Sequence, residues 1–441
     1  MTSTNPKLAL LGGPRAVTVD AGDTFKWPIV TPEDEAAVLE VLRRGAMSDL
    51  DVTMAFEEEF ARWQGRVYAL GFNTGTAALH AAMFGVKLGV GDEIICPSVT
   101  YWASVLQCLT LGATPVFADI DPDTLCVDPD DIERHISPYT RAIMVVHYLG
   151  HPADMDAIME IAQRHGLEVI EDVSHAHGGL YKGRKVGTFG KVAAMSLMSG
   201  KSLPIGEGGM LVTDDREVYE RAIAFGHYRR YDDRIQSPYL RQFRGLPMGA
   251  QKCRMNQLGA AMGRVQLKYY DERAAEIRKA INAFWDLLEG VPGLRAHRVP
   301  PDGDSTMAGW YSASGHYVPE ELGGLSVTRF CEAVRAEGSA CTPGLNKPLH
   351  LHPLFNTCDI YGHGKPTRLA FAHRDVRQPR GSLPVSEGIG ARTFKIPAFK
   401  RYHAEVIEQH AAAFRKVAEN YKALLADDPG NPPDLCDWDL D

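Results

Sequence analysis

The chain has 441 residues, of which 45% are hydrophobic and 23% are charged, as is ordinary for a globular protein with a large core. Its formal net charge of -9 argues against non-specific binding to nucleic acid, which requires a basic surface. We recognise no secretory signal, and no apolar run approaches the roughly 20 residues of a membrane span. We therefore expect a cytoplasmic protein with neither a membrane nor a nucleic-acid partner.

Short apolar runs alternate with amphipathic helical patterns between residues 56 and 215. We predict strands at residues 92–98, 114–120, 141–150 and 167–172, and helices at residues 76–86, 101–112, 128–136 and 155–166. This alternation indicates an α/β fold whose mostly parallel sheet carries helices on both faces. Ligands bind such sheets at the carboxyl ends of the strands.

A long helical pattern at residues 256–290 predicts the segment that carries the chain out of its large domain. We expect an N-terminal segment (1–30), a large domain (31–265), and an interdomain helix with a small C-terminal α+β domain (266–426). The acidic, proline-rich remainder (427–441) is expected to be a flexible tail.

Lys201 and Asp172 are the first candidates for a reactive site. Lys201 lies between small residues, after an apolar run and before the glycine cluster GEGG, whereas Asp172 ends the apolar run LEVIED. Such a pair suggests pyridoxal phosphate (PLP) chemistry, in which a lysine holds the cofactor as a Schiff base and a carboxylate keeps the pyridine nitrogen protonated. Either residue alone would indicate little.

Thr74, Gly75 and Thr76 open a predicted helix in the segment FNTGTAALHAA. Backbone N–H groups and hydroxyls at a helix N-terminus attract anions such as phosphate, although an ordinary helix cap explains the same residues. The chain contains neither a GxGxxG nor a GxxxxGK[ST] pattern, so nucleotide binding of the Rossmann or P-loop type is poorly supported.

Three further side chains extend the PLP hypothesis. Tyr101 follows a predicted strand and could stack on a planar ring, although core packing is the more ordinary explanation for such a residue taken alone. His175 could hydrogen-bond a cofactor hydroxyl or hold Asp172 in place, and a structural histidine is the alternative. Ser196, five residues before Lys201, could bind phosphate.

Other patterns leave the substrate open. His350 and His352 have the HxH spacing of metal ligands, but no third ligand cluster accompanies them, so we expect no metal site. The segments at residues 227–245 and 346–355 could determine specificity, and His227, Tyr228, Arg229 and Arg230 could bind a hydroxyl-rich or anionic substrate. A solvated loop explains these residues as well.

The chain resembles the DegT/DnrJ/EryC1/StrS group of PLP-dependent sugar aminotransferases over about residues 8 to 425. The segments that carry the resemblance include FKWPIV, NTGTAALHAA, GDEIICPSVTYWAS, VIEDVSHAHGGLYKGRKVGTFG, SLMSGKSLPIGEGGMLVTDD and CRMNQLGAAMGRVQL. The resemblance implies a fold-type I PLP-transferase, with a mostly parallel seven-stranded sheet in its large domain and a small C-terminal α+β domain.

The resemblance also implies roles for single residues. Lys201 corresponds to the lysine that holds PLP, Asp172 to the partner of the pyridine nitrogen, and His175 to the residue beside the ring hydroxyl. Tyr101 corresponds to the ring that stacks on PLP. Thr74, Gly75, Thr76 and Ser196 match the phosphate-binding residues. The family uses asparagine from the partner subunit of a homodimer where this chain has Lys252, a side chain that could also meet a phosphate.

We predict an aminotransferase that moves an amino group from glutamate or glutamine to a ketone of a sugar, cyclitol or related polyol by a ping-pong mechanism. Lys201 favours amination, since dehydrating relatives have histidine at this position. The alternatives are a dehydrating, ring-forming synthase of the 3-amino-5-hydroxybenzoate type, a PLP-binding regulator without catalysis, and a binding protein that uses no cofactor.

Overall fold

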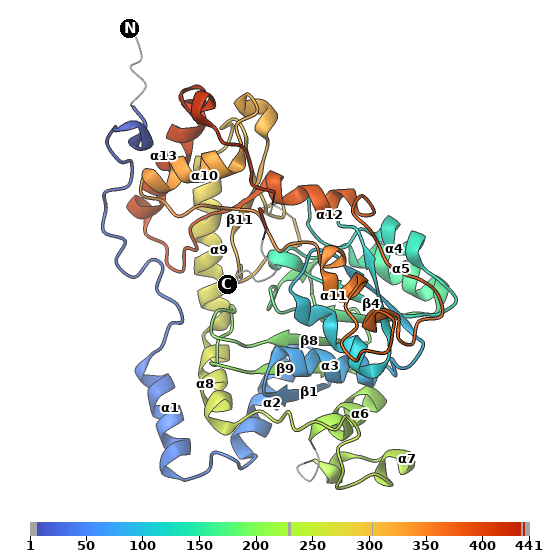
Figure 1. Ribbon diagram of the computed structural model, residues 1–441. Coiled ribbons are helices and arrows are strands. Elements are labelled where there is room, and N and C mark those ends of the chain that lie inside the picture. The colour runs from blue at the N-terminus through green and yellow to red at the C-terminus, as the bar shows by residue number, and fades with distance from the viewer. Residues whose placement is uncertain (1–6, 228–230, 302, 434, 437–441) are drawn as a thin grey trace.

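A seven-stranded sheet forms the centre of the larger part of the molecule (Figure 1). The computed structural model describes residues 7–227, 231–301, 303–433 and 435–436. The strands, in spatial order, are β1 (Tyr68–Phe72), β9 (Gly209–Thr213), β8 (Val192–Ser196), β5 (Glu168–Asp172), β4 (Thr140–Val146), β2 (Glu93–Pro97) and β3 (Thr114–Ala118). Strand β9 is antiparallel to both neighbours, and the other pairs are parallel. The predicted mostly parallel α/β sheet is confirmed.

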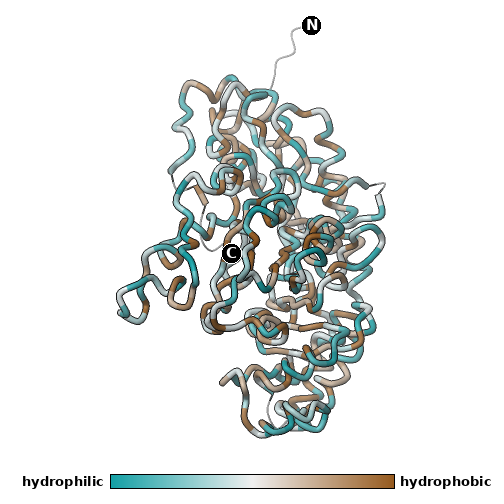
Figure 2. Tube along the Cα trace, turned by 90° about the vertical axis from the view of Figure 1, so that its right-hand side faces the viewer, coloured by the Kyte–Doolittle hydropathy of each residue, from teal (hydrophilic) through white to brown (hydrophobic). Residues whose placement is uncertain are grey.

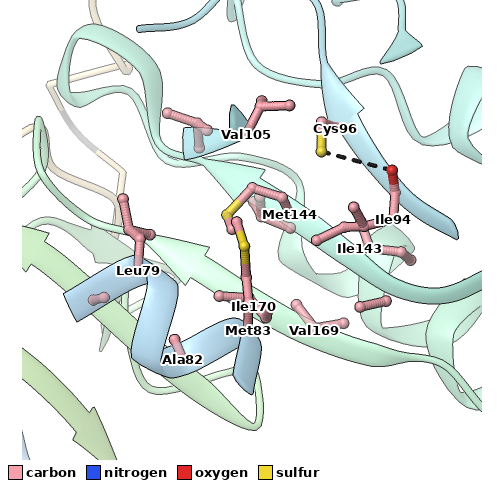
Figure 3. Packing of buried hydrophobic residues seen from close by; sticks show 14 of the residues in the cluster. Leu79, Ala82, Met83, Ile94, Cys96, Val105, Ile143, Met144, Val169 and Ile170 are labelled. Atoms are coloured by element: carbon pink, nitrogen blue, oxygen red, sulfur yellow. Dashed lines mark hydrogen bonds between the residues drawn. The ribbon is translucent and has the colours of Figure 1, made fainter. Parts of the chain in front are cut away.

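The two faces of this sheet pack into separate hydrophobic cores. In β8, Val192 and Ala194 belong to one core, whereas Ala193 and Met195 belong to the other, because successive side chains of a strand point to opposite faces. Helix α3 (Gly75–Gly85) covers the first face, and Figure 3 shows its residues Leu79 and Met83 beside side chains of β4 and β5. Helix α2 (Asp51–Gln64) contributes Phe56 and Phe60 to the second core. Such buried packing on both faces holds the strand ends in place.

The remaining helices of the larger part lie around this sheet. They are α1 (Pro32–Arg43), α4 (Pro129–His135), α5 (Met155–His165), α6 (Arg216–Gly226), α7 (Pro238–Arg241) and α8 (Gln257–Lys268). A two-stranded ribbon, β6 (Leu180–Tyr181) with β7 (Arg184–Lys185), completes it. No helix among the described residues is both long and apolar enough to cross a bilayer.

Two predicted helices require correction. Residues 256–290 form two helices, α8 and α9 (Tyr270–Leu287), separated at Tyr269, whose φ of -103° and ψ of 4° leave the helical region. The predicted helix at residues 101–112 consists of two short 3₁₀ turns, Trp102–Ser104 and Leu106–Leu111, separated by Val105. A β-branched residue at this break is consistent with its reduced helix propensity.

A second sheet lies in the C-terminal part of the chain. Its antiparallel strands, in spatial order, are β10 (Leu294–Ala296), β11 (Ser314–Tyr317), β13 (Thr393–Lys395) and β12 (Thr342–Pro343). The helices that accompany this sheet are α9, α10 (Val327–Ala336) and α13 (Ala404–Glu419). The short helices α11 (Pro353–Asn356) and α12 (Pro384–Gly388) instead contribute Phe355 and Val385 to the core on the first face of the large sheet. Residues of α9, α10 and α13 share a hydrophobic core with Phe394 of β13. Figure 1 shows α9 running from α8 up to α13.

The described part of the acidic tail contacts the N-terminus of α10. Asp428 accepts a hydrogen bond of 2.7 Å from the backbone N–H of Ser326, and Asn431 accepts one of 2.9 Å from the Thr328 hydroxyl. Hydrophobic and hydrophilic stretches alternate along the described part of the chain in Figure 2.

Candidate active site

A cavity of about 670 Å³ opens at the carboxyl ends of the parallel strands. Eight of the nine residues predicted to bind the cofactor line it, namely Thr74, Gly75, Thr76, Tyr101, Asp172, His175, Ser196 and Lys201. The ninth, Lys252, is exposed and does not line the cavity of its own chain. The structure therefore brings together side chains that are distributed over more than a hundred residues of sequence.

Asp172 lies at the end of β5 and is buried, with 4% of its surface exposed. The Ser104 hydroxyl donates a hydrogen bond of 2.7 Å to one carboxylate oxygen, and the Ser174 backbone N–H donates one of 3.0 Å to the other. Because the Ser104 hydroxyl proton is donated to Asp172, the Ser104 oxygen accepts a hydrogen bond of 3.0 Å from the Thr100 hydroxyl. These donors hold the carboxylate in one orientation. Ser104 and Thr100 were not predicted from the sequence.

The N-terminus of α3 faces the same cavity. Thr74 caps this helix by accepting a hydrogen bond of 3.0 Å from the N–H of Ala77. Gly75 packs so closely on the end of β8 that an added Cβ would lie 2.6 Å from the Cα and Cβ of Ser196. The missing side chain therefore brings the first N–H groups of the helix beside the Ser196 hydroxyl. Backbone N–H groups and hydroxyls in this arrangement form an anion-binding site.

Lys201 follows β8 in a loop whose backbone is held at several points. Its N–H donates to the Met198 carbonyl across 2.8 Å, and its carbonyl accepts from the Trp27 indole N–H across 3.1 Å. Its ammonium group lies 3.6 Å from the centroid of the Tyr311 ring, at which distance the π face attracts the cation. The Lys201 side chain is thus aimed along the cavity wall.

His175 is neutral in this arrangement. Its Nδ1 accepts a hydrogen bond of 3.3 Å from the Leu149 N–H, so Nε2 carries the proton of the neutral ring. Burial, the Lys201 charge, His177 and the Lys395 charge hold the pKa of His175 well below its usual range. Its ring stacks on Tyr311 with centroids 4.3 Å apart and an interplanar angle of 20°. A neutral His175 can donate a hydrogen bond from Nε2.

His177 connects the two segments that flank Lys201. Its Nε2 donates to the Ser196 carbonyl across 2.9 Å, so its Nδ1 accepts from the Ser202 hydroxyl across 3.1 Å. Burial, followed by the Lys201 charge, lowers the pKa of His177 to about 3, which keeps this tautomer neutral. His177 therefore positions the Lys201 loop.

The C-terminal part of the chain closes one side of the cavity with Tyr311, Ser312, Asn346 and Lys395. Tyr311 follows Ala308 and Trp310, which have positive φ values of 44° and 43°, a costly conformation for residues other than glycine. Asn346 accepts a hydrogen bond of 2.7 Å from the Tyr148 hydroxyl, which follows β4. Asn346 is the first residue of the segment 346–355, which was considered from the sequence as a determinant of specificity. The segment WYS and the lysine within the apolar run TFKIPAF are the sequence signals for the other three residues.

The other residues that were considered for substrate or metal binding do not line this cavity or lie outside the described part of the chain. His227 is buried, and its Nε2 donates a hydrogen bond of 2.8 Å to the Gly71 carbonyl. Residues 228–230 are outside the described residues. His350 contacts the Ser98 hydroxyl at 2.7 Å, and His352 caps α11. These two histidines thus have structural partners.

Comparison with known proteins identifies the family. The profile of the DegT/DnrJ/EryC1/StrS aminotransferase family matches residues 28–415. The chain belongs to this family. It is therefore an aminotransferase, and because members of the family depend on PLP, it is a PLP-dependent enzyme.

Individual relatives match over most of their length. The L-glutamine:scyllo-inosose aminotransferase of Streptomyces griseus is 33% identical over 447 residues, with 95% of this chain and 99% of the relative covered. The dTDP-3-amino-3,4,6-trideoxy-alpha-D-glucose transaminase of Streptomyces venezuelae is 38% identical, with 83% and 86% covered. The solved aminotransferase of Psychrobacter cryohalolentis is 29% identical, has a TM-score of 0.79, and covers 90% of this chain and 99% of its own.

The lining of the cavity fits PLP. The α3 N-terminus and its hydroxyls suit the phosphate, the carboxylate of Asp172 suits a protonated ring nitrogen, and the Lys201 amine suits the aldehyde. The absence of a side chain at Gly75 lets the start of α3 pack against the end of β8, since an added Cβ would clash with Ser196, and this packing keeps the helix N-terminus at the cavity.

Proposed function

We propose that this aminotransferase transfers an amino group from glutamate or glutamine to a ketone of a sugar, cyclitol or related polyol by a ping-pong mechanism. One observation carries the proposal: Lys201, Asp172 and the N-terminus of α3 line a single cavity. The names of the Streptomyces griseus and Streptomyces venezuelae relatives support the acceptor class, and the former supports glutamine as donor.

The side chains of the chain would hold the cofactor as follows. The N–H groups at the start of α3, with Thr74, Thr76 and Ser196, bind the phosphate. The carboxylate of Asp172 would accept a hydrogen bond from the protonated ring nitrogen. The Ser104 hydroxyl keeps that carboxylate oriented. Tyr101 stacks on one face of the ring, and neutral His175 donates from Nε2 to the ring hydroxyl.

Bound PLP supplies an aldehyde that takes up the donor's amine and a ring that withdraws electrons from the carbon losing its proton. The Lys201 amine would take the proton from the donor α-carbon as a general base and return it as a general acid. The Tyr311 ring keeps the Lys201 amine beside that path. Because donor and acceptor use the same cavity, the keto acid leaves before the ketone enters.

We further propose a homodimer in which Lys252 reaches the phosphate bound by the partner subunit. Lys252 is exposed and lies outside its own cavity, while the carbonyl of the adjacent Cys253 accepts from the Asn73 N–H across 2.7 Å, next to the start of α3. A lysine in this position could add a point charge to a phosphate site.

The test is a screen of keto-sugars and inososes with L-glutamine and L-glutamate as donors, with products identified by mass spectrometry. Amination of at least one such ketone is expected. An aromatic, dehydrated product from a cyclic ketone would instead support the ring-forming synthase. Absorbance of bound PLP without conversion of either donor would support the non-catalytic regulator.

A further inference from the structure

The charge distribution inside the cavity leaves one cation without a role in the function proposed above. Among the described residues that line the cavity, the cationic side chains are those of Lys201 and Lys395. Lys201 is committed to the cofactor and the proton transfer. Lys395 ends β13, on the opposite side of the cavity from the parallel sheet.

The strand geometry directs Lys395 toward the cavity. Its neighbour Phe394 is fully buried in the core formed with α10 and α13, and adjacent residues of a strand point to opposite faces. Strand β13 lies between β11 and β12, where Ser314 and Thr342 are the cross-strand partners of Lys395. These short side chains leave a half-buried lysine beside the cavity.

The Lys395 charge also acts close to the reacting centre. It is among the charges that lower the pKa of His175, a buried ring stacked on Tyr311, which in turn contacts the Lys201 ammonium group. Lys395 therefore lies on the substrate side of the site and within electrostatic reach of His175 and Lys201.

An amino-acid donor carries a negatively charged α-carboxylate into the part of the cavity beside Lys395. Its α-carboxylate is bonded directly to the carbon that loses the proton, so its cationic partner must lie beside the reacting centre. The phosphates of a nucleotide-linked sugar are several bonds away from the ketone and would reach farther out. A half-buried ammonium group gains more from a carboxylate than an exposed one would.

We propose that Lys395 binds the α-carboxylate of the amino donor and so selects amino acids over simple amines. This inference rests on the proposed function. Lys395 is a specificity residue of the donor half-reaction, and it has no part in binding the neutral ketone of the acceptor half-reaction.

The test compares matched donors in single-turnover experiments with PLP-loaded enzyme. L-glutamine and L-glutamate are each paired with the α-carboxamide analogue, which lacks the negative charge. Lys395→Met should lower kcat/KM for the two amino acids about 10- to 100-fold, and change it for the carboxamides by less than about threefold. Lys395→Arg should recover most of the loss. Calorimetry with 2-methyl-L-glutamate, which cannot lose an α-proton, should show the same weakening as a binding constant.

Lys279→Met is the matched control, since Lys279 is an exposed lysine of α9 that packs over Tyr402. It should leave both half-reactions unchanged. If Lys395→Met still prefers the amino acids over their α-carboxamide analogues as strongly as wild type, the role of Lys395 is wrong, while the proposed function stands. A loss confined to the acceptor half-reaction would also overturn that role and assign the charge to an acceptor phosphate. A wild-type enzyme that converts no amino acid would instead overturn the proposed function itself.

Discussion

The Lys201 ammonium group lies over the Tyr311 ring, 3.6 Å from its centroid, although two strands and four α-helices (α6 to α9) separate the two residues in the described part of the chain. The ring is presented by a backbone with two non-glycine residues at positive φ. Strained backbone persists where the surrounding structure requires it, often at active sites. The contact indicates that Tyr311 positions the Lys201 amine.

This contact predicts different effects for two Tyr311 variants. Tyr311→Phe keeps the π face and should retain the donor half-reaction within about threefold, whereas Tyr311→Leu should slow it about 5- to 30-fold, as expected for loss of a partly buried cation–π contact. Stopped-flow absorbance in the presence of donor measures both. Equal rates in wild type and Tyr311→Leu would contradict the positioning role.

The sequence predicted Asp172 but not Tyr311, for a physical reason. A buried strand that ends in an acidic residue is readable from LEVIED, and ligands bind at such strand ends. Tyr311 and Lys395 line the cavity only because the C-terminal part of the chain closes one side of it, and hydrophobic periodicity does not encode that relationship. Nor does an apolar run reveal strand direction, so the antiparallel β9 was not predicted.

Asp172→Asn should separate cofactor binding from turnover. The substitution keeps the size of the side chain but removes the charge that stabilises a protonated ring nitrogen, so turnover should fall about 100-fold or more while some PLP remains bound. Ser104→Ala should reduce turnover less, since the carboxylate keeps its bond to Ser174. PLP absorbance and steady-state kinetics measure the two effects. Asp156→Asn, an exposed carboxylate of α5, is the control.

Gly75→Ala tests the phosphate cradle. The added Cβ would lie 2.6 Å from two atoms of Ser196, so α3 must move away from β8, and PLP affinity should fall at least about tenfold with a loss of about 1–3 kcal/mol of stability. Equilibrium dialysis and denaturant unfolding measure these quantities. Gly388→Ala, where an added Cβ meets nothing within 4 Å, should change neither. Unaltered PLP affinity in Gly75→Ala would count against the cradle.

Glu171, next to Asp172, predicts an acid-sensitive fold. Burial opposes its charge, but hydrogen bonds from His147 and from the N–H groups of Gly190 and Gly187 outweigh it and lower the pKa of Glu171. A lowered folded-state pKa stabilises the fold above the unfolded pKa of about 4.3, and this stabilisation is lost as the pH falls through the folded value.

Glu171→Gln should therefore cost about 1–3 kcal/mol at pH 7, because it weakens the hydrogen bonds that the buried carboxylate accepts, and should flatten the pH dependence of unfolding below about pH 4.5. Denaturant unfolding between pH 3 and 7 measures both. Glu133→Gln, which removes a partly exposed partner of His165, should have little effect. An unchanged acid profile in Glu171→Gln would assign the acid sensitivity to other carboxyl groups.

Whether Lys201 holds PLP can be read from the position at which the cofactor is trapped on the enzyme. PLP-loaded enzyme is reduced with borohydride, digested, and analysed by peptide mass spectrometry. We expect a pyridoxyl phosphate group fixed on Lys201, and no such adduct after Lys201→Ala. A reduced adduct on Lys395, Lys252 or another lysine of the wild-type enzyme would contradict this expectation.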